Sequence, residues 1–135
     1  GRQSVVVSID VRKDNDSYRV YTHSGRCPSG RPLIEFIAAI EHMGAGELLI
    51  TSMDREGSMQ GYDLNLLRMV TDVAHIPVIA GGGAGCLADF VLASKDAHAA
   101  AVSAGSLFVF HGRRRGILIN YPSRPEINRL FSQQP

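Results

Sequence analysis

The chain has 135 residues, of which 44% are hydrophobic and 20% charged, as in an ordinary globular domain. A formal net charge of +1 and the lack of an apolar run near 18 residues argue against nucleic acid or a membrane as partner. Two cysteines outside any short metal-type spacing, and a start without the apolar stretch of a signal peptide, predict a reduced cytoplasmic protein without metal or cofactor.

Strand-like and helix-like segments alternate along the chain. The β-branched run over residues 4–10 ends in Asp10 and is typical of a buried parallel strand. The helical spacing of apolar residues over 33–40 predicts a helix that ends at Gly44 and Gly46. The further elements expected in chain order are an excursion at 18–22, a loop at 25–30, a strand at 47–51, a loop at 53–62, a helix at 64–73, a strand at 76–80, a glycine loop, a helix at about 87–94, a strand at 99–103, a short turn, a basic stretch at 111–115, an apolar run at 117–119 and a helix at about 124–131.

These elements form four consecutive βα units in a single domain over residues 1–135. Such units predict a parallel α/β sheet with right-handed crossovers, and four of them make half of a TIM (βα)₈ barrel. A half barrel leaves two parallel strand edges open, and open edges need pairing or cover. We therefore expect a homodimer or a missing partner segment, although an open sheet that rearranges to cover its own edges is an alternative.

Chemistry in such barrels lies where strands end and βα loops begin. Asp10 stands at the first of these points, where a carboxylate can serve as a general acid or base. A helix cap, or an ion pair with Arg12 or Lys13, is the alternative role. Position in the chain alone does not decide between them.

Three more loops have residues suited to a phosphorylated ligand. Residues 51–57 combine hydroxyls, acids and a glycine, although a polar surface loop with an Asp–Arg pair explains them as well. Residues 81–85 hold four glycines in five positions, more than a tight turn needs, and we expect backbone N–H groups of this loop and of the following helix N-terminus to face an anion. Residues 103–106 follow the last strand, where barrel phosphate sites often lie.

Other reactive residues give weaker signals. Cys86 follows the glycine loop, where a packing or capping role is expected rather than a reactive thiol. The five histidines have no metal-ligand spacing. Arg113 to Arg115 are expected to form a solvated face, with a phosphate or partner contact as the alternative.

Seven motifs appear in order along the chain: VVVSID (5–10), THSGR (22–26), GAGELLITS (44–52), DREG (54–57), GYD (61–63), IPVIAGGGAG (76–85) and GS (105–106). Together they resemble the C-terminal half of the HisF family, the cyclase subunits of imidazole glycerol phosphate synthase. The related HisA isomerases are expected to have Gly-Pro-Asn at positions 61–63, which favours the cyclases.

The resemblance implies a lyase-type cyclase of histidine biosynthesis. Asp10 matches a catalytic aspartate that works as acid and base in ring closure. Glu47 matches a gate at the barrel floor, where ammonia enters from a HisH-like glutaminase partner. The substrate is implied to be a phosphoribulosyl compound or another phosphorylated sugar. The residues expected to bind it are Thr51, Ser52, Glu56, Gly57, Gly81, Gly82, Gly83, Gly105 and Ser106.

Two positions and the tail depart from the family pattern. Glu56 stands where the family usually has aspartate, and Gly81 where it often has serine. The tail from Gly105 to Arg124 resembles HisF paralogues that amidate sugars for bacterial surface polysaccharides. The family's other catalytic aspartate lies in the absent half, so a symmetric dimer would have to supply Asp10 twice. The alternatives are a phosphate-binding module without turnover and a fragment of a longer protein.

Overall fold

The computed structural model describes residues 5–22, 27–105, 110–111, 116–117 and 123–132. Its main elements are β1 (Val6–Asp14), β2 (Ser17–Thr22), β3 (Cys27–Pro32), α1 (Leu33–His42), β4 (Glu47–Ser52), α2 (Leu64–Val73), β5 (Val78–Gly81), α3 (Leu87–Val91), the π-helix η2 (Leu92–Asp96) and β6 (Ala101–Val102). Two short strands, β7 (Phe110–His111) and β8 (Gly116–Ile117), and the helix α5 (Arg124–Ser132) follow.

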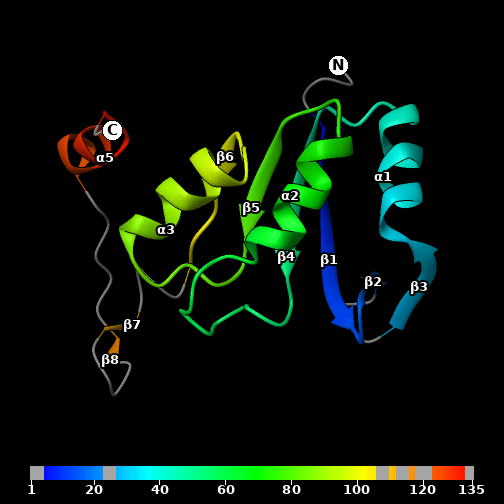
Figure 1. Ribbon diagram of the computed structural model, residues 1–135, viewed down its shortest axis with the longest axis horizontal. Coiled ribbons are helices and arrows are strands. Elements are labelled where there is room, and N and C mark those ends of the chain that lie inside the picture. Colours follow the sequence, from blue (N-terminus) through cyan, green and yellow to red (C-terminus); the bar gives the residue numbers. More distant parts are fainter. Residues whose placement is uncertain (1–4, 23–26, 106–109, 112–115, 118–122, 133–135) are drawn as a thin grey trace.

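The main sheet has six strands in the order β3-β2-β1-β4-β5-β6. The strands β1, β4, β5 and β6 pair in parallel, each next to the following one in the chain. Helices α1, α2 and α3 lie along one face of this sheet (Figure 1). The predicted α/β architecture, four parallel strands of a partial TIM barrel, is therefore confirmed.

Strand β1 is longer than predicted, because it continues past Asp10 to Asp14. Its parallel pairing with β4 stops at Val11, and its last five residues pair antiparallel with β2. Asp10 is thus not the end of the strand, but it lies where the parallel part of the barrel wall ends. The excursion at 18–22 is the strand β2 of this hairpin, as the alternating pattern suggested.

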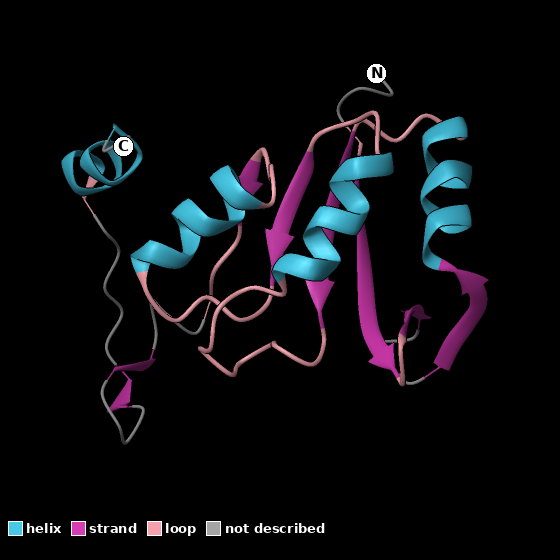
Figure 2. Cartoon of the chain, viewed as in Figure 1, coloured by secondary structure: helices cyan, strands magenta, loops and turns pink. Residues whose placement is uncertain are grey.

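The predicted loop at 25–30 is wrong for residues 27–30, which belong to β3. This strand lies at the edge of the sheet, the position where the missing N–H of a proline is tolerated. The hairpin extends the sheet beside the C-terminal part of β1, which is its lower end in Figure 2. Among the described residues, the hairpin thus covers the edge of the parallel sheet only beside residues 10–14 of β1, so the alternative of a sheet that covers its own edges is realised only there.

Alternation along β4 separates the two faces of the sheet. Leu48 and Ile50 are fully buried under the helices, whereas Leu49 and Thr51 on the other face are only half-buried. Helix α2 lies where the sequence predicted a helix, and it contributes Leu66, Leu67 and Val70 to the same core. The helical side is thus closed, and the opposite face of the parallel strands is the more open one.

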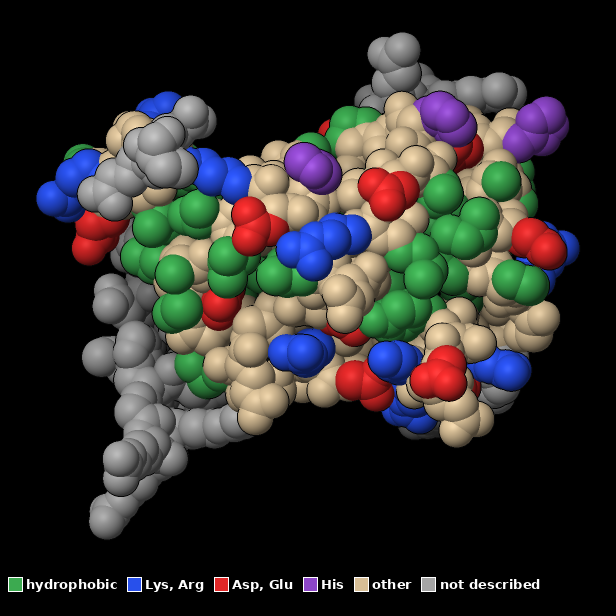
Figure 3. Space-filling model, viewed as in Figure 1, with side chains coloured by type: hydrophobic (Ala, Val, Ile, Leu, Met, Phe, Trp, Pro, Cys, Tyr) green, Lys and Arg blue, Asp and Glu red, His purple; other side chains and the backbone are tan. Residues whose placement is uncertain are grey.

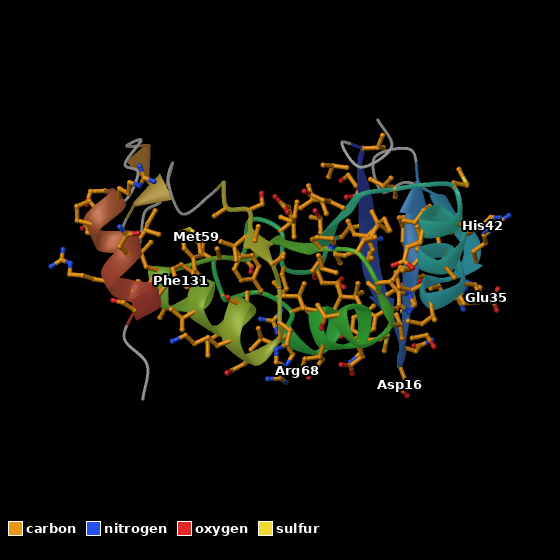
Figure 4. The ribbon with its side chains drawn as sticks, turned by 90° about the horizontal axis from the view of Figure 1, so that it is seen from above. Asp16, Glu35, His42, Met59, Arg68 and Phe131 are labelled. Carbon is orange, nitrogen blue, oxygen red and sulfur yellow. The ribbon has the colours of Figure 1, made fainter. Side chains whose placement is uncertain are left out.

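Two further elements differ from the prediction. The helix expected at 87–94 changes to a π-helix at Leu92, and the strand expected at 99–103 is reduced to Ala101–Val102. The last helix occurs where it was expected, and Phe131 points from it toward α3 (Figure 4). No helix among the described residues is long and apolar enough to cross a membrane.

Side chains of both charges are interspersed over the helical face seen in Figure 3. Apolar side chains are exposed between them, among them Ile34, Met69, Val73 and Leu92. The visible face therefore has no extended surface of one charge.

Candidate functional site

A pocket of about 440 Å³ lies at the C-terminal ends of the parallel strands. Residues from four strands or the loops that follow them form its wall, which is the arrangement expected of a barrel active site. Its lining residues are Asp10, Thr51, Met53, Glu56, Gly57, Met59, Gly81, Gly82, Gly83, Ala84, Ser103, Ala104 and Gly105.

Strand register brings three of these residues to one level. Asp10 on β1 is the partner of Thr51 on β4, and Thr51 is the partner of Gly81 on β5. A Cβ atom on Gly81 would lie 2.8 Å from the Thr51 hydroxyl oxygen. The Thr51 hydroxyl thus takes the space of a side chain at position 81, and the half-buried Asp10 carboxylate lies one strand further on.

Only one of the three consecutive charged residues 54–56 lines this pocket. Asp54 turns outward and accepts a hydrogen bond from the Lys13 amide at 2.8 Å. The Arg55 guanidinium donates to the Gln60 carbonyl oxygen at 3.3 Å and lines a separate surface hollow beside α2. The predicted alternative of an Asp–Arg pair is therefore not formed, and Glu56 alone faces the site.

The glycine loop is packed tightly against the loop that follows β4. A Cβ atom on Gly83 would overlap the carbonyl oxygen of Gly61, and one on Gly85 would overlap the carbonyl oxygen of Met59. The Gly61 amide also donates to the Gly83 carbonyl oxygen at 2.7 Å. Contact between the two loops is thus a reason for glycine at these positions that is independent of any ligand.

The amides of the glycine loop divide into two groups. Asp89 accepts hydrogen bonds from Gly85 at 2.8 Å and Cys86 at 3.0 Å, so these two amides at the start of α3 are occupied. The amides of Gly82, Gly83 and Ala84 have no hydrogen-bond partner within the described part of the chain. The expectation that the helix N-terminus also faces an anion is therefore wrong for Gly85 and Cys86, and the unpaired donors lie before it.

Tyr62 connects the site loops to β6. Its buried ring lies under the pocket wall, and its hydroxyl donates to the Ser103 carbonyl oxygen at 2.8 Å. Burial, with a smaller contribution from the Asp89 charge, raises the pKa of Tyr62 well above its usual value. The phenol therefore stays protonated and keeps the wall segment 103–105 in contact with the loop after β4.

Charge in the pocket is one-sided. Asp10 and Glu56 are its ionisable lining residues, and no Lys, Arg or His within the described residues lines it. An anion in this pocket would therefore be bound by neutral donors, backbone N–H groups and the hydroxyls of Thr51 and Ser103, and the carboxylates would accept hydrogen bonds from ligand hydroxyl or amine groups. No group of three or more His, Cys, Asp or Glu side chains in the described ranges could hold a metal ion.

Comparison with known sequences agrees with this geometry. The family described as "Histidine biosynthesis protein" matches residues 1–114. The chain belongs to this family. Over 110 residues it is 47% identical to imidazole glycerol phosphate synthase subunit HisF of Chlorobaculum tepidum and 49% identical to that of Hyphomonas neptunium. These alignments cover 82% of this chain but only 44% of each relative, so the chain spans less than half their length.

The resemblance to the HisF family is thereby confirmed, and the pocket brings together most of the residues expected from it. Ser52 does not line the pocket, because its side chain is buried on the other face of β4, where its hydroxyl accepts a hydrogen bond from the Arg55 amide at 3.3 Å. Glu47 is half-buried at the opposite end of the same strand. Ser106 lies outside the described residues, as do Arg113 to Arg115. The predicted residues that line the pocket are Asp10, Thr51, Glu56, Gly57, Gly81, Gly82, Gly83 and Gly105.

Met53 and Met59 line the pocket, but the sequence did not single them out as site residues. Met59 has a positive φ of 57°, a conformation uncommon for methionine that no sequence signal indicated. In Figure 4 it lies toward the side of the sheet away from Arg68 of α2. Ala84 and Ser103 were within the expected loops but were not singled out.

Tyr18 links the β2 strand to the loop before α2, and this contact gives a pH-dependent prediction. Its hydroxyl donates to the Asp63 carboxylate at 3.0 Å, which also caps α2 through the Leu66 amide. Burial and the Asp63 carboxylate raise the pKa of Tyr18 from 10.0 to about 12. A raised folded-state pKa stabilises the fold below pH 10, and this contribution is lost as the pH rises from 10 toward 12.

We therefore expect Tyr18→Phe to be less stable than the wild type at about pH 8, and this difference to shrink toward about pH 12. The measurement is the free energy of unfolding in urea for both proteins across this range. A stability difference that stays constant up to that pH would contradict the assignment.

Proposed function

We propose that this chain is half of a cyclase barrel of the imidazole glycerol phosphate synthase type. It would bind a phosphoribulosyl substrate or a related phosphorylated sugar in the pocket, and use ammonia from a glutaminase partner in ring closure. The observation that carries the proposal is one arrangement: Asp10 lines the same pocket as Gly82, Gly83 and Ala84, whose amides have no partner in the described part of the chain.

The roles follow from the chemistry of these groups. The N–H groups of the glycine loop would hold a phosphate, because three consecutive amides without a partner among the described residues lie at the pocket, and no described Lys, Arg or His lines it. The Asp10 carboxylate would transfer protons during ring closure, since a half-buried carboxylate within reach of the bound sugar can serve as acid and base. Thr51, its neighbour in register, would orient a substrate hydroxyl.

A second copy of the chain would complete the barrel. Within the described residues, 6–9 of β1 pair only with β4, and β6 pairs only with β5, so both edges of the parallel sheet are open. Val6 is 50% exposed, and Ser8 and Ala101 are also exposed on the open face. Two copies related by a two-fold axis would pair these edges and place two Asp10 carboxylates across one mouth.

Entry of ammonia is proposed at the other end of the strands. Glu47 begins β4, five residues before the end of the strand at Ser52, and it is half-buried. A glutaminase of the HisH type would dock at this end, so that Glu47 would act as the gate that the family resemblance implies. The partner and the gate rest on the relatives named HisF alone, and the pocket does not depend on them.

The experiment measures molecular mass and ammonia-dependent cyclase turnover on the same purified chain. A dimer that converts the phosphoribulosyl substrate only when an ammonium salt is present supports the proposal. A dimer that instead amidates a phosphorylated sugar of the kind used in surface polysaccharides supports the alternative function suggested by the tail. A monomer that binds phosphate compounds without turnover supports the binding module or a fragment, and overturns the self-completed barrel.

A further inference from the structure

We propose that Glu56 is a specificity-determining residue that disfavours inorganic phosphate and favours a phosphate attached to a polyol. This inference rests on the proposed function, because it assumes that the glycine loop binds phosphate. It adds a selection step at that same site, made by the one residue of the 54–56 segment that faces the pocket.

The Glu56 carboxylate lies close to Gly82 of the glycine loop. Its Oε2 atom lies 3.1 Å from the place that a Cβ atom on Gly82 would take. The Glu56 amide donates to the Ser52 carbonyl oxygen at 2.9 Å, which fixes the start of this side chain in the turn after β4. The carboxylate therefore lies beside the glycine loop, whose amides at 82–84 have no partner among the described residues and would receive a phosphate.

The negative charge of Glu56 acts on an anion bound in the pocket. No described cation lines the pocket to neutralise Glu56, and the neighbouring Arg55 is turned to Gln60. In water, a unit charge about 5 Å from another like charge lowers the affinity about fourfold, and a doubly charged phosphate feels a larger effect. A free phosphate ion thus meets repulsion at the loop that otherwise suits it.

The hydroxyl groups of a polyol phosphate can offset this repulsion. An ionised carboxylate only accepts hydrogen bonds, and a hydroxyl close to the phosphate would donate one to it. The same Glu56 charge that weakens binding of the bare anion therefore strengthens binding of the sugar part. Selectivity between the two ligands, rather than affinity for either, is the property that Glu56 sets.

The test compares dissociation constants of inorganic phosphate and D-ribulose 5-phosphate, measured by calorimetry for the wild type and Glu56→Gln. We expect the variant to bind inorganic phosphate at least threefold more tightly and ribulose 5-phosphate no more tightly than the wild type. Asp54→Asn is the matched control, because Asp54 also carries one charge in this loop but faces the Lys13 amide. Both of its dissociation constants should stay within twofold of the wild-type values.

The outcomes distinguish failure of the phosphate site from failure of the Glu56 role. A wild-type chain that binds neither ligand overturns the proposed function, and this inference with it. Binding of both ligands by the wild type, with Glu56→Gln changing neither constant or both by the same factor, overturns the selectivity role and leaves the phosphate site intact. An equal effect of Asp54→Asn would reduce the result to general surface charge and would also overturn it.

Discussion

Asp10→Asn should lower ammonia-dependent cyclase turnover at least 100-fold and leave the stability of the fold unchanged. General acid–base catalysis contributes about 10²- to 10⁴-fold to the rate of a reaction. Asparagine keeps the shape of the side chain, but its amide cannot serve as a general acid or base. In a two-fold dimer, one substitution removes the carboxylate from both positions of the mouth. No Asp10 carboxylate would remain in the dimer to sustain turnover.

The control for this experiment is Asp16→Asn. Asp16 is exposed in the turn between β1 and β2, and it points away from the molecule (Figure 4). Its turnover and its urea midpoint should equal those of the wild type. Turnover that survives Asp10→Asn at more than a tenth of the wild-type rate would remove Asp10 from the chemistry, and binding without turnover in both proteins would favour the non-catalytic module.

Gly85→Ala should destabilise the fold by about 3 kcal/mol and lower the melting temperature by roughly 10 °C. The added Cβ atom would meet the Met59 carbonyl oxygen, with the Met59 carbonyl carbon 2.7 Å away. Backbone atoms cannot rotate away as the end of a side chain can, so the two site loops would have to separate. The expected measurement is urea unfolding followed by circular dichroism.

Gly105→Ala is the matched comparison, because its Cβ atom would meet no atom of the described residues within 4 Å. Its free energy of unfolding should stay within about 0.5 kcal/mol of the wild-type value. Neither Gly85 nor Gly105 has a positive φ, so backbone strain does not separate the two variants. Equal stability of the two would show that the loops are not packed as described.

The architecture was predictable because its signals are local. Short apolar runs predicted the parallel strands, and apolar spacing predicted α1 and α2, whose ends agree with the prediction within a few residues. The extension of β1 was not predictable, because residues 11–14 are stabilised by pairing with β2 rather than by their own pattern. A π-helix at Leu92–Asp96 has no signal in composition or spacing either.

The site was predictable at the level of loops but not of every side chain. The strand period of two could have separated Thr51 from Ser52, because neighbouring side chains on a strand face opposite sides. The orientation of Asp54, Arg55 and Glu56 could not be foreseen, since it depends on where the turn places each side chain. The glycine-rich loop also has a structural cause, its contact with Met59 and Gly61, that the sequence alone did not distinguish from ligand binding.

Amide NMR tests most directly whether the amides before α3 form a phosphate site. The ¹⁵N-labelled chain is titrated with D-ribulose 5-phosphate. We expect saturable shifts at the amides of Gly82, Gly83 and Ala84, and much smaller ones at Gly85 and Cys86, whose amides are held by Asp89. Unchanged amides at 82–84, or larger shifts at Gly85 and Cys86, would contradict a phosphate site there.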